Sequence, residues 1–79
     1  MSYDMQNDRL KYFRLINKRI ELNNLKLNPV TIWELYYHQE PSYKHQDGVE
    51  YSNLMIAKER KVFNKCIQHI DDIVKNLSN

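Results

Sequence analysis

Aromatic and histidine side chains concentrate in residues 33–45, which read WELYYHQEPSYKH. Tyrosine and tryptophan are typical of protein-binding surfaces, because they combine a large contact area with few rotatable bonds. We therefore predict that a partner protein binds here. The candidate binding residues are Trp33, Tyr36, Tyr37 and Tyr43. The alternative is that these rings pack at the edge of a helical core, with their polar tips in water.

Cys66 and His69 stand three positions apart, so on one helix both side chains could reach one metal ion. Structural zinc normally takes four ligands, and the sequence has no second pair at a matching spacing. Cys66 falls among apolar residues, which favours a small core side chain over a metal ligand or a nucleophile. The single glycine also excludes a glycine-rich phosphate loop. We expect no catalytic residue, metal site or cofactor, and hence a protein that is not an enzyme.

Lysine and arginine recur at helical spacing in the first and last parts of the chain. The residues that could neutralise nucleic-acid phosphates are Lys11, Arg14, Lys18, Lys58, Lys61 and Lys65. The formal net charge is only +2, which is less than phosphate-binding proteins usually carry. The alternative is that these cations only solvate the outer faces of two helices.

Leu15 and Leu22 fall beside the basic residues of the first segment, away from Phe13 and Ile20. Apolar side chains among cations are typical of an interface edge, although singly exposed leucines are common. We predict a second partner-binding face at Leu15 and Leu22. A membrane-surface helix can carry a similar pattern, but the low net charge argues against membrane binding.

Two prolines and one glycine divide the chain into three segments with helical periodicity. The first helix is expected at about residues 3–24, before an asparagine-rich exit that tolerates left-handed turns. Its predicted core face carries Leu10, Phe13, Ile16 and Ile20, with Tyr12 off that face. A short helix is expected at about 29–39, between the Asn28-Pro29 start and Pro41. Its predicted core side carries Ile32, Leu35, Tyr36 and Gln39.

The third helix, expected at about residues 49–77, has the strongest periodicity in the chain. Apolar residues recur there every seven positions, at Val49, Ile56, Phe63, Ile70 and Leu77. The three lysines 58, 61 and 65 fall on the opposite, outer face of the helical wheel. Two shorter helices cannot cover a rod of roughly 40 Å. We therefore predict a homodimer formed through Ile56, Phe63, Ile70 and Leu77, with fraying of the helix end as the alternative.

The length of 79 residues suits one small helical domain, residues 1–79, with a modest core. The composition is globular, and no alternating strand pattern is present, so we predict an all-α, three-helix arrangement. One cysteine cannot form an intramolecular disulfide. No membrane-spanning run or signal-peptide pattern is visible, and the expected location is the cytoplasm.

These patterns favour a small helical module that binds another protein as a regulator or inhibitor. The abundance of Asn, Lys, Ile and Tyr is typical of AT-rich genomes, which suits a phage or mobile-element origin. The alternative function is a weakly basic regulator that binds nucleic acid through the lysines and arginines of the first and third helices.

Overall fold

Three α-helices make up the computed structural model, which describes the backbone of residues 2–43 and 48–78. Side chains are described for residues 8–43, 48 and 50–78. Helix α1 spans Ser2–Leu22, α2 spans Pro29–Tyr37 and α3 spans Gly48–Ser78. The predicted all-α fold is confirmed, with two long helices and a short middle one. None of these helices combines the length and the apolar character needed to cross a bilayer, within the described residues.

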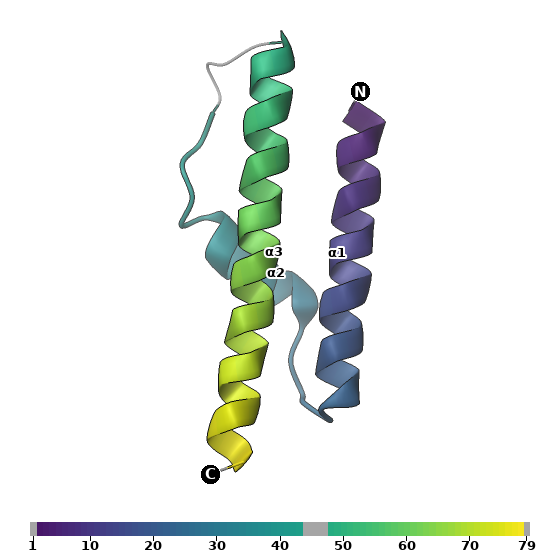
Figure 1. Ribbon diagram of the computed structural model, residues 1–79, viewed down its shortest axis with the longest axis vertical. Helices are drawn as coiled ribbons and strands as arrows, with labels where there is room; N and C mark the ends of the chain where they lie inside the picture. The colour runs from purple at the N-terminus through teal and green to yellow at the C-terminus, as the bar shows by residue number, and fades with distance from the viewer. Residues whose placement is uncertain (1, 44–47, 79) are drawn as a thin grey trace.

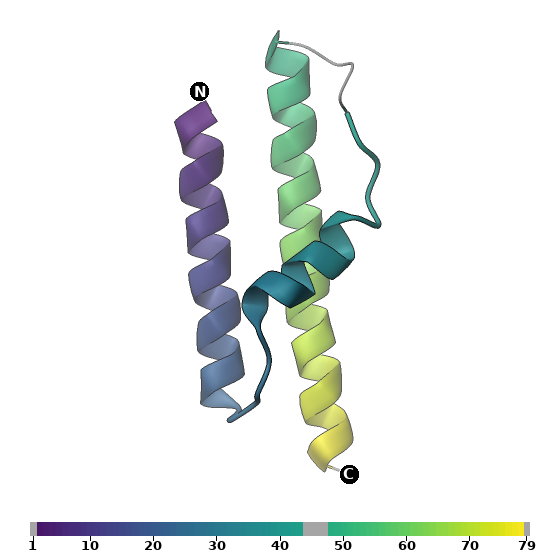
Figure 2. The same cartoon turned by 180° about the vertical axis from the view of Figure 1, so that it is seen from behind.

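Helices α1 and α3 lie side by side and run in the same direction, and α2 passes behind α3 and the space between the two helices (Figure 1). Seen from the other side, α2 starts beside α1 and runs diagonally across α3 (Figure 2). The chain after α2 returns to the end of the molecule where α1 begins, which allows α3 to run parallel to α1. The molecule measures 47 × 21 × 15 Å. Thus α2 covers one face of the α1/α3 pair, and no described helix covers the opposite face.

Local sequence signals account for both ends of the α1–α2 connection. Helix α1 ends with Asn24 in a left-handed conformation at φ 57°. The Leu25 N–H donates to the carbonyl of Ile20, and the Asn24 N–H donates to that of Glu21, which is a Schellman motif. Helix α2 then starts where the Asn28 side chain accepts a hydrogen bond from the N–H of Val30 at 2.9 Å. The asparagine-rich exit and the Asn28-Pro29 start therefore act as predicted.

Helix α2 ends at Tyr37, two residues before the predicted end. The next N–H groups bond three residues back, from Gln39 to Tyr36 and from Glu40 to Tyr37, instead of continuing the α-helical ladder. Pro41 disfavours the helical conformation at the residue before it. The last turn therefore tightens, and the chain leaves the helix early.

The core lies where α2 crosses the other two helices. Its buried residues are Ile16, Ile20, Ile32, Trp33, Val62, Cys66 and Ile70. The ring of Trp33 lies 5.1 Å from that of Phe13, measured between centroids, and 6.2 Å from that of Tyr12. Aromatic rings of α1 and α2 thus extend the aliphatic centre of the core toward the start of α1.

The core face of α1 is rotated relative to the prediction. Leu10 is 56% exposed, although it was predicted in the core. Tyr12 was predicted off the core face, but its ring stacks on that of Phe63 at 4.5 Å. Around the helix, Leu10 lies about 100° from the midpoint of Ile16 and Ile20, whereas Tyr12 lies only about 60° away on the side of α3.

The core face of α2 also differs from the prediction. Leu35 is 50% exposed and Gln39 is exposed, whereas both were predicted on the core side. Trp33, expected at the flank, is only 5% exposed. The reason is that α2 lies between two helices, with Trp33 against α1 and Tyr36 against α3. Its buried arc is centred between these two residues, and Leu35 falls outside it.

The seven-residue stripe of α3 is only partly buried within the chain. Ile70 is fully buried, Ile56 and Phe63 are half-buried, and Leu77 is 71% exposed. The side chain of Val49, the first member of the stripe, lies outside the described residues. Ile70 is therefore enclosed by its own chain, and the predicted homodimer could use only the other three stripe residues.

Replacing Ile70 by alanine should lower the free energy of unfolding by about 2–5 kcal/mol, because a fully buried side chain leaves a cavity. Leu77→Ala, on the same stripe but exposed, should change it by less than about 0.5 kcal/mol. Urea unfolding followed by circular dichroism measures both. Equal losses in the two variants would show that Leu77 is covered in the folded protein, as in the predicted homodimer.

Candidate protein-binding groove

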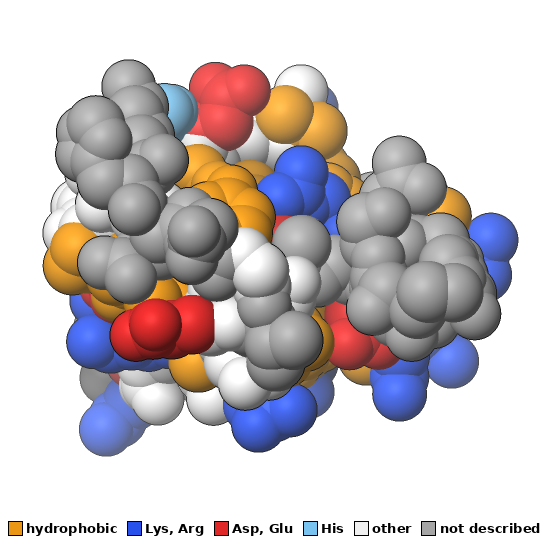
Figure 3. Space-filling model, turned by 90° about the horizontal axis from the view of Figure 1, so that it is seen from above, with side chains coloured by type: hydrophobic (Ala, Val, Ile, Leu, Met, Phe, Trp, Pro, Cys, Tyr) orange, Lys and Arg blue, Asp and Glu red, His pale blue; other side chains and the backbone are white. Residues whose placement is uncertain are grey.

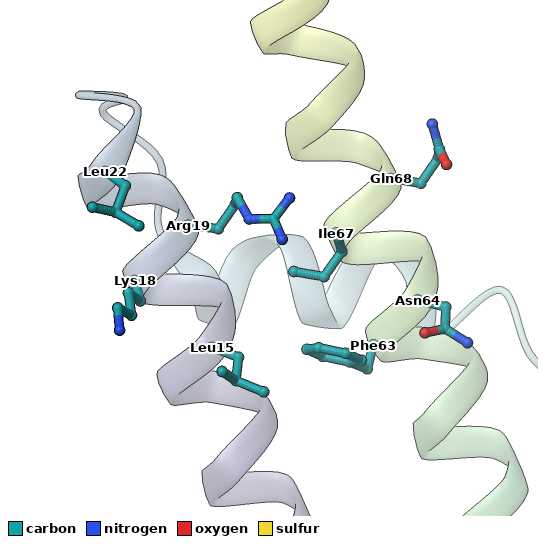
Figure 4. Close-up of a pocket in the computed structure, with 8 residues that line it drawn as sticks. All are labelled: Leu15, Lys18, Arg19, Leu22, Phe63, Asn64, Ile67 and Gln68. Atoms are coloured by element: carbon teal, nitrogen blue, oxygen red, sulfur yellow. The ribbon is translucent and has the colours of Figure 1, made fainter.

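A groove of about 510 Å³ runs between α1 and α3 on the face opposite α2 (Figure 4). Its lining residues are Leu15, Lys18, Arg19 and Leu22 of α1, and Phe63, Asn64, Ile67 and Gln68 of α3. Leu15 and Leu22 are 42% and 73% exposed, while Phe63 and Ile67 are half-buried. The groove therefore has apolar walls that no described residue covers.

Helical spacing accounts for the apolar part of this groove. Leu15 and Leu22 are seven residues apart and share one face of α1, and Phe63 and Ile67 are four apart on α3. Arg19 points across the groove toward α3 (Figure 4), and its Nη1 lies 2.7 Å from Oδ1 of Asp71. Both partners of this ion pair are nearly half exposed, so it contributes at most about 1 kcal/mol.

The α1 side of the groove is basic. Lys18 lines the groove, and Lys11 and Arg14 line a shallow extension of about 440 Å³ beside Leu15. All three cations are exposed, and none has an ion-pair partner among the described residues. Viewed down the long axis, Lys and Arg side chains lie along the lower edge of the molecule, which is the front of Figure 1, both on the α3 side at the left and on the α1 side at the right (Figure 3).

The aromatic segment is divided between the core and a second part of the surface. Trp33 is buried, so this ring packs in the core, as the alternative to a binding surface predicted. Tyr36 is half-buried, and its hydroxyl lies 2.7 Å from Nδ1 of His69. Residues 44 and 45, at the end of the segment, lie outside the described part. The structure therefore does not bring this segment together with Leu15 and Leu22.

Tyr37 and Tyr43 lie around the amine of Lys58. The Nζ atom of Lys58 is 4.0 Å from the ring centroid of Tyr37 and 6.0 Å from that of Tyr43, distances typical of cation–π contacts. Both tyrosines are half-buried, and they line a hollow of about 450 Å³ that includes Tyr51 and Met55. A partner-binding role for Tyr36, Tyr37 and Tyr43 remains a prediction.

Lys58 was predicted on the outer face of α3, but it is only 7% exposed. The chain after α2 folds over this side of α3, and Lys58 Nζ donates a 2.9 Å hydrogen bond to the carbonyl of Pro41. The predicted outer-face position of Lys58 is therefore wrong, and its burial disfavours the untested prediction that it contacts phosphates. Lys61 and Lys65 lie 3.2 and 2.9 Å from the two carboxylate oxygens of Glu40. These three lysines hold residues 38–43 against α3.

Sequence reasoning also missed a buried carboxylate. Glu59 is 2% exposed, and its Oε2 lies 2.6 Å from Arg9 Nη2, a hydrogen bond that raises the pKa of Arg9. The Oε1 atom of Glu59 has no hydrogen-bond partner among the described residues. One signal could have placed it, because Glu59, Cys66 and Ile73 are spaced by sevens on the core side of α3.

Cys66 is fully buried, and burial raises the pKa of its thiol to about 11. The side chain therefore stays protonated near neutral pH and packs as a small apolar residue. His69, three residues further on, points its Nδ1 at Tyr36. Within the described residues, no three His, Cys, Asp or Glu side chains gather closely enough to hold a metal ion.

Comparisons of the chain with protein-family models, curated proteins and solved structures find no match. Function is therefore inferred from the geometry of the groove and from its charges.

Glu40→Gln should reduce the loss of stability in acid. Lys65 donates a hydrogen bond to the Glu40 carboxylate and lowers its pKa, with a further contribution from Lys61. A carboxylate with a lowered folded-state pKa stabilises the protein above its unfolded value, and this contribution disappears as pH falls through the folded value.

The urea midpoint of the natural protein should therefore fall more between about pH 7 and about pH 3 than that of the Glu40→Gln variant. Glu34→Gln is the control, because Glu34 is exposed and has no ion-pair partner among the described residues. If all three proteins show the same pH dependence, the Glu40 pairs do not stabilise the fold.

Proposed function

We propose that this protein is a non-enzymatic helical module that regulates or inhibits another protein by binding it through the α1/α3 groove. The supporting observation is that α2 covers only one face of the α1/α3 pair and leaves the apolar groove open on the other. A phage or mobile-element origin remains compatible with this role.

The shape of the groove favours a helix as the bound element. Two neighbouring helices present ridges and grooves into which a third helix packs, with apolar residues spaced three, four and seven apart. Leu15 and Leu22 are separated by about 10.5 Å along α1, which equals two turns of a bound helix. The half-buried ring of Phe63 offers the large aromatic contact that is typical of binding hot spots.

Photo-crosslinking tests this proposal even when the partner is unidentified. Benzoylphenylalanine placed at Leu22 of the full chain, in cells of the organism that encodes it, should yield a discrete adduct with one other protein. The same probe at Leu35, which is 50% exposed on α2 outside the groove, should not yield it. Gel mobility and mass spectrometry identify the adduct.

The adduct at Leu22 should disappear when Leu15→Asp is added, because a carboxylate would then occupy the apolar wall. Leu35→Asp is the matched control and should leave the adduct unchanged. Equal crosslinking from Leu22 and Leu35, or none above background from Leu22, would contradict binding through the groove.

Nucleic-acid binding is the weaker alternative. It is supported by the exposure of Lys11, Arg14 and Lys18 on one side of α1. On α3, however, Lys58 is buried, and Lys61 and Lys65 share the carboxylate of Glu40. Only half of the predicted phosphate contacts therefore lie on one accessible surface.

Titration with duplex and single-stranded DNA separates the two functions. If the three α1 cations contact phosphates of a duplex, the log–log dependence of affinity on salt should have a slope of about −2.7. Glutamine at these three positions should remove that dependence. No detectable binding at low salt would exclude the nucleic-acid alternative.

A further inference from the structure

The two sides of the α1/α3 groove differ in charge. On α1, Lys11, Arg14 and Lys18 are exposed and lack ion-pair partners among the described residues. On α3, the polar lining residues Asn64 and Gln68 are neutral. Asp71 is the nearby acid of α3, and its carboxylate is already paired with Arg19. Arg60, exposed and seven residues before Ile67, is a single cation on the α3 side, and Asp8 is an exposed acid on α1 seven residues before Leu15. A bound element therefore meets a row of three unpaired cations along α1 and one cation on the α3 side.

A second copy of this chain does not neutralise that edge. In a two-fold contact through the groove, the same surface is used by both copies. The basic edge would then face either the basic edge of the other copy or its α3 edge, where Asn64 and Gln68 are neutral and Arg60 adds a further cation. Like charges disfavour the first arrangement, and the second leaves all three cations unpaired.

We infer, on the basis of the proposed function, that the groove binds an amphipathic α-helix of a partner protein that carries Asp or Glu along its edge facing α1. Lys11 and Lys18 are seven residues apart, so two acidic residues spaced by seven on the partner helix can reach both. Arg14 lies between them, three residues after Lys11 and four before Lys18. It can therefore pair with a third acidic residue that lies between the other two on the partner helix. The apolar face of the partner helix then contacts Leu15, Leu22 and Phe63.

The charges contribute more to the choice of partner than to the total binding free energy. Exposed ion pairs each change affinity by at most about fivefold, and salt weakens them. Apolar contacts with the groove walls supply the remaining binding free energy and respond little to salt. We therefore expect a preference for acidic helices that decreases with ionic strength, on top of a salt-insensitive apolar contribution.

Three synthetic helical peptides of about 14 residues, each spanning ~21 Å, test this inference. They share one leucine stripe and differ only at the edge positions, which carry Glu, Gln or Lys. Fluorescence anisotropy against the full chain measures their affinities. The Glu peptide should bind about tenfold more tightly than the Gln peptide at low salt, and the Lys peptide should bind more weakly than both.

Charge-matched variants locate the effect. Lys11→Gln with Lys18→Gln should remove most of the preference for the Glu peptide. Lys26→Gln with Lys75→Gln removes the same charge from exposed positions that do not line the groove, and should leave the preference intact. Leu22→Asp should weaken all three peptides, whereas Leu35→Asp should not, and circular dichroism checks that each variant is folded.

Each other outcome overturns the inference in a distinguishable way. Equal affinity for the three peptides, all weakened by Leu22→Asp, would leave a helix-binding groove and remove the acidic partner. Failure of every peptide to bind at millimolar concentration would also reject the acidic helix, while crosslinking at Leu22 tests the proposed function independently. Sedimentation showing a dimer that Leu22→Asp dissociates would assign the groove to a second copy.

Discussion

The packing of α2 across one face of the parallel α1/α3 pair is the contact on which the structure depends. Ile32 and Trp33 supply the α2 part of the core, between the isoleucines of α1 and the aliphatic residues of α3. Because a nine-residue helix cannot surround two helices of 21 and 31 residues, burying these two side chains leaves the opposite face open. The groove therefore follows from the way the core is built.

Polar contacts hold the chain that returns from α2 to the start of α3. Lys58 bonds to the Pro41 carbonyl and lies against the Tyr37 ring, while Glu40 accepts from Lys65 and pairs with Lys61. Cations that sequence patterns place on a solvated face are used here to fix a connection. Lys11, Arg14 and Lys18 of α1 are left exposed and without ion-pair partners among the described residues, beside the groove, whereas Arg60 is the exposed cation that shares the groove face of α3.

The proposed function depends on this combination of an open apolar wall and a row of cations along α1. The aromatic segment contributes less than its composition indicates, because Trp33 is buried in the core and Tyr36 and Tyr37 pack beside α3 and its lysines. Leu15 and Leu22 contribute more, because both line a groove with Phe63 and Ile67 of α3, and Leu15 faces Phe63 across it (Figure 4). A pair of exposed leucines becomes one wall of a groove only when a second helix supplies the other.

The sequence by itself determined the three helices, an asparagine-rich exit able to make a left-handed turn, the cap at Asn28 and the burial of Ile16, Ile20, Cys66 and Ile70. These features depend on local hydrogen bonds and on helical periodicity, which neighbouring residues encode. The end of α1 at Leu22, two residues before the predicted end, and the left-handed residue at Asn24 came from the structure. Only the tertiary structure decided that Leu10 and Leu35 are exposed, that Tyr12, Lys58 and Glu59 are covered, and that a groove exists. Those outcomes depend on the direction in which α3 runs beside α1 and on the side that α2 covers, and periodicity within one helix carries no information about either.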